Sequence, residues 1–137
     1  AMMALVVREP KRFDVIVTTN MFGDILTDLT AELSGSLGLA ASLNAGFSHA
    51  MAQAAHGSAP DIAGQDRANP WSLILSASQL LAWHGERSQR RALIDAARAI
   101  DGAVAVAISR GETTRDIGGS LGTRATGEKL AARILAT

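Results

Sequence analysis

The hydrophobic residues change their period along the chain, and this change constrains the fold more than any other feature of the sequence. Residues 13–19, FDVIVTT, form a continuous run rich in β-branched residues, which is typical of a strand buried on both faces of a parallel sheet. The residues that follow predict an amphipathic helix, because apolar side chains recur at helical spacing at Ile25, Leu26, Leu29 and Leu33.

Two short strands are expected after this first helix. Residues 35–38, GSLG, break the helical pattern. The segment 38–46 then predicts a short strand that ends at Asn44-Ala45-Gly46, and residues 47–55 predict another.

The second half of the chain predicts long helices. Asn69 is expected as an N-cap and Pro70 as the first residue of a helix that stops at Gly85. Residues 86–109 indicate a second helix, and residues 126–136 a closing helix. Strands that alternate with helices and are followed by further helices indicate an α/β fold, a layered sheet with helices on its faces.

Composition excludes several classes of function. The chain has 137 residues with 13 basic and 13 acidic side chains, so nothing indicates a nucleic-acid or membrane surface. It has no cysteine, which excludes disulfides, thiolate metal sites and a cysteine nucleophile. No apolar run approaches the ~20 residues of a membrane span, and the first residues are apolar but too short and wrongly flanked to predict a secretory signal. We therefore expect a cytoplasmic protein.

Two carboxylates lie on one face of the first predicted helix. Asp24 and Asp28 are four residues apart near its expected N-terminus, where the helix dipole partly offsets their charge. Carboxylate oxygens one turn apart can reach one hard cation such as Mg²⁺ or Mn²⁺, although substrate, water or another chain must complete the coordination. The alternative is that both are solvated surface acids.

The loop of residues 56–69, HGSAPDIAGQDRAN, is a more specific signal. Gly57, Ser58 and Ala59 are small, which lets a ligand approach the backbone N–H groups. An acidic residue beside such a loop, here Asp61, can accept hydrogen bonds from ribose hydroxyls and repel a 2′-phosphate. The alternative is a surface loop whose Asp and Asn residues form local turns.

These motifs resemble the isocitrate/isopropylmalate dehydrogenase family. The resemblance is carried by N-x-F-G-D-I-L-x-D-L at residues 20–29 and H-G-S-A-P-D-I-A-G-x-x-x-A-N-P at residues 56–70, in the family's order and spacing. The segment TRDIGGSLGT, residues 114–123, is similar to the family's C-terminal loop. The resemblance implies a family fold that is not a Rossmann fold, which agrees with the missing G-x-G-x-x-G motif.

The resemblance also implies the cofactors and their ligands. In this family the two helix aspartates bind Mg²⁺ or Mn²⁺, so Asp24 and Asp28 are the expected metal ligands. NADP-dependent members carry Lys-Tyr where this chain has Asp61-Ile62, so NAD is the expected cofactor. The expected NAD-binding residues are His56, Gly57, Ser58, Ala59, Asp61, Ile62 and Asn69.

By the resemblance, the chain corresponds to only the C-terminal part of such an enzyme. Residues 1–35 match the end of the metal-binding and dimerisation domain, and residues 36–137 match the C-terminal half of the NAD-binding domain. The family's catalytic tyrosine and lysine have no counterpart, since the chain contains no tyrosine and neither Lys11 nor Lys129 lies in a matching context. No catalytic residue is therefore assigned, and we expect this chain alone to be inactive.

The implied activity is oxidative decarboxylation of a malate-type 2-hydroxy acid, of the 3-isopropylmalate, isocitrate or tartrate class, by a homodimeric enzyme. The alternative is a non-catalytic remnant that at most binds nucleotide or associates with another subunit.

Overall fold

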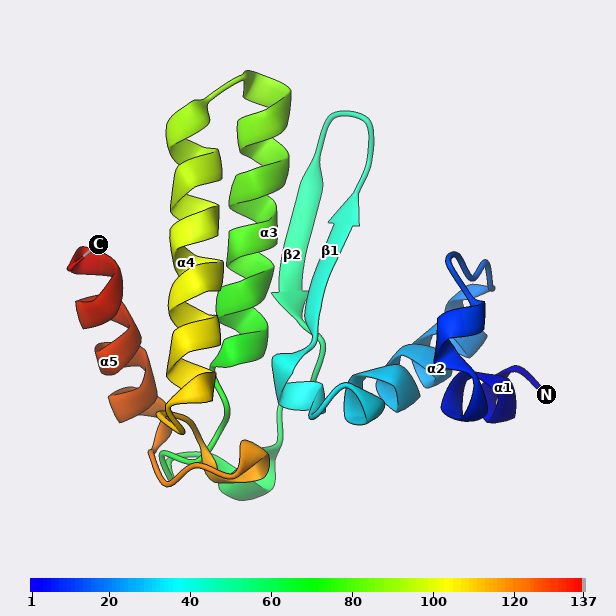
Figure 1. The fold of residues 1–137 in the computed structure, drawn as a ribbon, viewed down its shortest axis with the longest axis horizontal. Helices are drawn as coiled ribbons and strands as arrows, with labels where there is room; N and C mark the ends of the chain where they lie inside the picture. Colours follow the sequence, from blue (N-terminus) through cyan, green and yellow to red (C-terminus); the bar gives the residue numbers. More distant parts are fainter. Residues whose placement is uncertain (137) are drawn as a thin grey trace. The chain divides into compact units, whose positions relative to one another are not determined.

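The chain divides into two compact units, Ala1–Leu37 and Gly38–Thr137. The computed structural model describes residues 1–136, and Figure 1 shows their course. The division lies close to the domain boundary predicted at residue 35. Which functional domain each unit represents stays a prediction.

The first unit is built from two helices. Helix α1 (Met2–Arg8) contacts helix α2 (Asn20–Leu33), and each contributes one buried apolar side chain, Val6 and Leu26. The predicted helix that follows residue 19 is confirmed. Beyond its C-terminus, the Leu37 backbone N–H donates to Glu32 Oε1 at 2.9 Å, which satisfies a group just past the helix end.

The strand predicted for residues 13–19 is wrong. These residues have no regular secondary structure, and Val15 and Val17 are 81% and 92% exposed. A strand buried on both faces needs neighbouring strands to pair with its backbone. Among the described residues, the pairing strands are β1 and β2 alone, and they pair with each other.

The second unit contains a small antiparallel sheet covered by a helix. Strand β1 (Ala41–Ala45) pairs with strand β2 (Ala50–Ala54) in a register that places Ala41 opposite Ala54 and Ala45 opposite Ala50. Helix α3 (Trp71–Ser88) contacts both strands, as Figure 1 shows. The two predicted short strands and the α/β class are confirmed, although the two described strands pair antiparallel rather than in a parallel sheet.

Buried serines join α3 to the sheet. Ser76 Oγ accepts a hydrogen bond from the Ser42 N–H at 3.0 Å and donates to Gln53 O at 2.7 Å. Ser72 Oγ accepts from the Ala55 N–H at 3.0 Å, directly before the loop of residues 56–69. Both serines are 0% exposed, so these hydroxyls satisfy backbone groups that water cannot reach.

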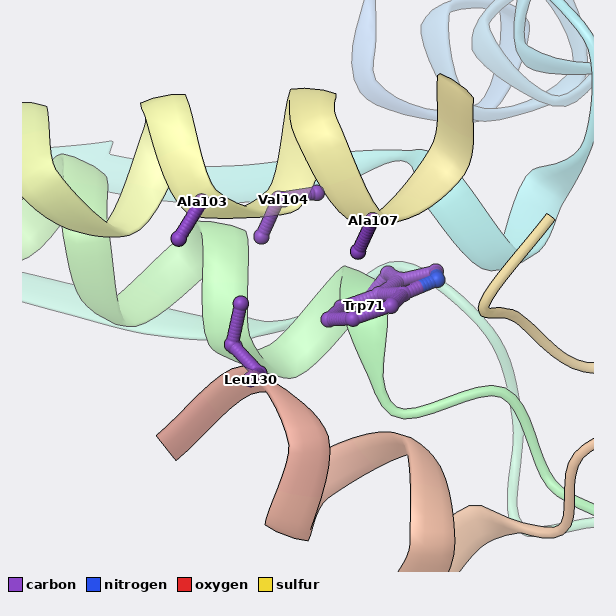
Figure 2. Close-up of a cluster of buried hydrophobic side chains, with 5 residues drawn as sticks. All are labelled: Trp71, Ala103, Val104, Ala107 and Leu130. Atoms are coloured by element: carbon purple, nitrogen blue, oxygen red, sulfur yellow. The ribbon is translucent and has the colours of Figure 1, made fainter. Parts of the chain in front are cut away.

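Helices α3, α4 (Arg91–Ser109) and α5 (Thr123–Leu135) pack in sequence order, α3 on α4 and α4 on α5. Figure 2 shows the core between them, where the Trp71 indole lies among small and branched apolar side chains. The buried members of this core are Trp71, Ala103, Val104, Ala107 and Leu130. The alanines allow the helices to approach closely, and the indole fills the remaining space.

The helix stop predicted at Gly85 is wrong, because α3 continues to Ser88 and α4 begins at Arg91. Gly85 is buried, and a Cβ on it would lie 2.8 Å from Ile94 Cγ1 and 3.1 Å from the Ile94 backbone nitrogen. This glycine therefore permits a close helix contact. The turn between the helices instead uses Gln89, whose φ of 54° lies in the left-handed region.

Replacement of Gly85 by alanine is expected to destabilise the protein by about 1–3 kcal/mol, because the new methyl group would overlap the Ile94 side chain and lie closer than usual to the α4 backbone. The matched control is Gly102→Ala in α4, where a Cβ meets nothing within 4 Å. This control should stabilise the protein by up to about 1 kcal/mol through helix propensity alone. Urea unfolding followed by circular dichroism measures both effects. Equal effects of the two substitutions would contradict the packing role of Gly85.

Glu112 holds α5 against the end of α4. Its carboxylate forms ion pairs with Arg133 and, at 3.6 Å, with Lys129, both on α5. Desolvation raises the pKa of Glu112, but the hydrogen bond from Arg133 and the charges of Lys129, Arg133 and Arg110 outweigh it, so its pKa lies below the usual 4.5.

The lowered pKa predicts an acid-dependent loss of stability. A carboxyl group with a lower pKa in the folded state stabilises the protein above its unfolded pKa, near 4.5, and loses this contribution as the pH falls through the folded pKa. We expect Glu112→Gln to remove this part of the pH dependence below pH 4.5. Unfolding measured at pH 7 and at acidic pH tests the difference, and parallel pH profiles for the two proteins would contradict it.

Candidate functional site

Two loops of the second unit enclose a cleft of about 1050 Å³. One loop connects β2 to α3, and the other connects α4 to α5. The lining residues come from both loops, from the first residue of α5 and from a glycine shortly before β1. They are Gly38, His56, Gly57, Ser58, Ala59, Ile62, Ala63, Gly64, Gln65, Asp66, Arg67, Ala68, Asn69, Arg115, Asp116, Ser120, Leu121, Gly122 and Thr123.

The structure brings six of the seven predicted cofactor residues to this cleft. They are His56, Gly57, Ser58, Ala59, Ile62 and Asn69. Asp61 is not among the lining residues; it lies in the short 3-10 helix Pro60–Ile62, where its backbone carbonyl accepts a hydrogen bond from Gln65 Nε2 at 2.7 Å. The cofactor role of all seven residues stays a prediction.

The loop of residues 56–69 has a locally specified conformation. Ala59 has a φ of 41°, in the left-handed region that non-glycine residues seldom adopt, and it directly precedes Pro60. His56 Nδ1 lies 2.9 Å from Gly57 O, so the first turn of the loop carries its own side-chain contact. The loop has little regular secondary structure, and hydrogen bonds within the loop hold its conformation.

Asn69 connects the loop to both α3 and the second loop. Its Oδ1 accepts from the Trp71 N–H at 2.9 Å, and its Nδ2 donates to Asp116 Oδ2 at 2.8 Å. Asp116 Oδ1 accepts from Thr114 Oγ1 at 2.6 Å. The prediction of Asn69 as N-cap and Pro70 as first helical residue is wrong by one position, because the helix begins at Trp71 with Pro70 as its N-cap. Asn69 nevertheless accepts the hydrogen bond from the first helical N–H.

Residues of the second loop were not predicted as part of the site. Arg115, Asp116, Ser120 and Leu121 line the cleft, although the sequence related their segment only to a C-terminal loop and assigned it no ligand. The sequence signal that could have identified these residues is the motif at residues 114–123, which resembles the family's C-terminal loop. A Cβ on Gly119 would overlap the Thr113 carbonyl, so this loop depends on a close backbone approach.

The lining of the cleft combines charged, glycine and apolar residues, and its two arginines lie in the same lining as Asp66 and Asp116. Arg67 and Arg115 contribute two guanidinium groups, and Gly57 and Gly64 leave their surroundings open, because a Cβ on either would meet nothing within 4 Å. Ile62 and Leu121 supply apolar surface. Guanidinium groups and accessible backbone N–H groups are the partners that phosphates commonly use.

The predicted metal ligands lie in the first unit. Asp24 and Asp28 are exposed and one turn apart on α2, as predicted. They were predicted near the helix N-terminus, but α2 begins at Asn20 and both lie beyond its first turn, which has no acidic residue. The helix dipole falls off within that turn and so does little for their charge.

The described residues contain no group of three or more His, Cys, Asp or Glu side chains that could hold a metal ion. Asp24 and Asp28 therefore form a pair among the described residues, and their role as metal ligands stays a prediction. Within residues 1–136, no helix combines the length and the apolar character needed to cross a membrane.

Comparison with known proteins agrees with the motifs. The profile of the isocitrate/isopropylmalate dehydrogenase family matches residues 1–131. The chain is 52% identical over 136 residues to the 3-isopropylmalate dehydrogenase of Hahella chejuensis, covering 95% of this chain and 36% of that protein. It is 50% identical over 123 residues to the isocitrate/homoisocitrate dehydrogenase of Thermus thermophilus, covering 90% of this chain and 34% of that protein.

The fold agrees as well. The crystal structure of isocitrate dehydrogenase from Methylococcus capsulatus is similar with a TM-score of 0.87 and 43% identity, covering 97% of this chain and 38% of that chain. The apo β-decarboxylating dehydrogenase from Thermococcus kodakarensis gives a TM-score of 0.80 and 37% identity, covering 98% of this chain and 38% of that one. The chain thus spans about a third of the length of the relatives it matches. From its motifs, its fold and these comparisons, the chain belongs to the isocitrate/isopropylmalate dehydrogenase family.

Proposed function

We propose that this chain is the C-terminal part of an NAD-dependent, Mg²⁺- or Mn²⁺-dependent dehydrogenase that oxidises and decarboxylates a malate-type 2-hydroxy acid. The observation that carries the proposal is the cleft, which collects six residues predicted from sequence to bind NAD. The substrate class follows from the relatives, whose names include isocitrate, homoisocitrate and 3-isopropylmalate dehydrogenases. A homodimer is part of this proposal for the complete enzyme.

NAD would be held between the two loops. The open backbone at Gly57, with Arg67 and Arg115, suits the pyrophosphate, and Ile62 and Leu121 offer apolar surface to a base. Asn69 is held between Trp71 and Asp116, so its amide has one orientation. When bound, NAD supplies the hydride acceptor; the residues of this chain bind and orient it.

The metal would be held by Asp24 and Asp28 together with substrate oxygens. Two carboxylates one helical turn apart match the oxygen preference of a hard divalent cation. When bound, such a cation stabilises the charge that develops on substrate oxygen during oxidation and decarboxylation. Proton transfer is assigned to no residue of this chain, which has no tyrosine, so we expect no turnover by the chain alone.

Cofactor binding is tested first by titration of the chain with NADH and with NADPH, followed through nicotinamide fluorescence. Saturable NADH binding supports the proposal, and its absence contradicts the cofactor assignment. Turnover is tested in a chimera in which residues 1–137 replace the matching third of the Thermus thermophilus relative. Oxidation of isocitrate or 3-isopropylmalate that requires Mg²⁺ or Mn²⁺ supports the proposed reaction.

The preference for NAD should depend on Asp61 and Ile62. We expect replacement of both, by lysine and tyrosine, to shift the NADPH/NADH affinity ratio at least about tenfold towards NADPH, because the carboxylate that repels a 2′-phosphate is lost and a cation takes its place. The control is Asp61→Asn, which removes the charge alone and should shift the ratio less. An unchanged ratio in the double variant would show that Asp61, which does not line the cleft, does not select the cofactor.

A further inference from the structure

Helix α5 begins without a cap of its own. Its N-cap is Gly122, which has no side chain, and no side-chain cap hydrogen bond is formed there from the N-cap position. The first N–H groups of a helix have no partner within the helix and need an acceptor from elsewhere. The α5 N-terminus also lies at the cleft, since Gly122 and Thr123 are lining residues.

Asp66, in the other loop, supplies the missing acceptors. Its Oδ1 accepts from the Arg124 N–H at 2.8 Å, and its backbone carbonyl accepts from the Thr123 N–H at 3.2 Å. The Thr123 hydroxyl donates back to Ala68 O at 2.5 Å. A carboxylate at a helix N-terminus forms charge-assisted hydrogen bonds and interacts favourably with the helix dipole. Asp66 therefore caps α5 from across the cleft.

The local geometry is built around this contact. Asp66 has a φ of 54°, in the left-handed region, which aspartate tolerates better than most residues. A Cβ on Gly122 would overlap the Asp66 carboxylate, so glycine is required for the loop to approach this closely. Each partner thus has the residue type that the contact needs.

Helix α5 is the fixed side of the contact. Leu130 of α5 is buried in the core, and Arg133 pairs with Glu112 at the end of α4. The loop of residues 56–69 has no comparable anchor in the core between Pro60 and Arg67, where only Ile62 is even partly buried. Release of the Asp66 contact should therefore displace the loop and leave the helix in place.

We infer that Asp66 is a positioning residue of the cleft: by capping α5 it fixes the spacing between the two loops and so sets the affinity for the dinucleotide. This inference rests on the proposed function for its ligand. The contact between Asp66 and α5 is present without a ligand, so it can be tested in the unliganded chain.

The experiment compares the NADH affinity and amide hydrogen exchange of the full chain with those of four single variants, one of them a control, and one double variant. Asp66→Asn keeps the Oδ1 acceptor and the tolerance of positive φ, so its affinity should stay within about threefold of the wild type. Asp66→Gly keeps the backbone conformation but loses the acceptor, and Gly122→Ala displaces the carboxylate. Each should weaken NADH binding by about tenfold. The control is Asp95→Asn, a carboxylate on α4 that pairs with Arg91 outside the cleft.

The double variant separates positioning from general destabilisation. If Asp66 and Gly122 act through one contact, the double variant Asp66→Gly/Gly122→Ala should bind NADH no more weakly than the single variant with the lower affinity. If the two substitutions act independently, their losses of NADH affinity should multiply to about a hundredfold. Multiplied effects would overturn the inference. Failure of Asp66→Gly to change NADH affinity would overturn it as well.

Hydrogen exchange distinguishes failure of this inference from failure of the proposed function. If the wild-type chain does not bind NADH, the cofactor assignment fails by itself. The positioning role is then tested by hydrogen exchange alone. The amides of Thr123, Arg124 and residues 62–68 should exchange faster in Asp66→Gly than in the wild type or in Asp66→Asn. Equal exchange in all three proteins would overturn the inference.

Discussion

Replacement of Trp71 by alanine is expected to destabilise the protein by about 3–5 kcal/mol. The Trp71 side chain is 0% exposed and lies among Ala107, Leu130 and the other core residues shown in Figure 2. Its Nε1 donates to Thr113 Oγ1 at 3.0 Å. The substitution leaves both a large cavity and a buried hydroxyl without its donor. Since domains of this size are stable by about 5–15 kcal/mol, much of the margin would be lost.

Two matched variants identify the source of the effect. Trp71→Phe keeps most of the volume but removes the indole N–H, and should cost about 1–3 kcal/mol. Trp83→Ala removes the other tryptophan, which is only partly buried and contacts the Arg87 guanidinium at 4.7 Å from its ring centroid; it should cost about 1 kcal/mol. Urea unfolding followed by circular dichroism measures all three. If Trp71→Ala costs no more than Trp83→Ala, the core described here is wrong.

Replacement of Asp24 or Asp28 by asparagine is expected to lower kcat/KM of the chimera by at least about a hundredfold, because each substitution removes an anionic ligand from a metal whose charge stabilisation is worth several kcal/mol. The concentration of Mg²⁺ or Mn²⁺ needed for half-maximal rate should rise as well. Initial rates measured against metal concentration test both effects, and circular dichroism confirms that the variants fold.

The same helix provides the control. Glu32 lies further along α2, and its Oε1 accepts from the Leu37 N–H, so Glu32→Gln keeps a hydrogen-bond acceptor at that position. Its metal dependence should equal that of the unmodified chimera. If Asp24→Asn and Asp28→Asn also leave the metal dependence unchanged, the two aspartates are solvated surface acids and the metal assignment fails.

Much of the helical structure could be predicted because it depends on local spacing. The apolar residues from Ile25 to Leu33 form one stripe of α2, and Asn69 accepts a hydrogen bond at the start of α3. The helix predicted to end at residue 109 does so, and Gly111, with a φ of 66°, follows it. These signals act within one or two helical turns, so they can be recognised without knowledge of distant contacts.

The errors arose where distant residues decide the structure. Gly85 resembles a helix stop in the sequence, but its role is to let Ile94 of the next helix approach. Residues 13–19 have the composition of a buried strand, but no described strand pairs with them. Composition indicates a preference for strand structure, whereas pairing partners determine whether the strand forms.

The sequence by itself determined the family, the long helices and six of the residues with which the first loop lines the cleft. The tertiary structure alone decided that the second loop completes the cleft: Asn69 and Asp116 are 47 residues apart and meet at 2.8 Å. It also decided that Asp66 caps a helix to which it is not adjacent in sequence. The physical reason is that residue spacing encodes which side chains share a helix face or a turn, while the meeting of two loops depends on how α3, α4 and α5 pack around Trp71.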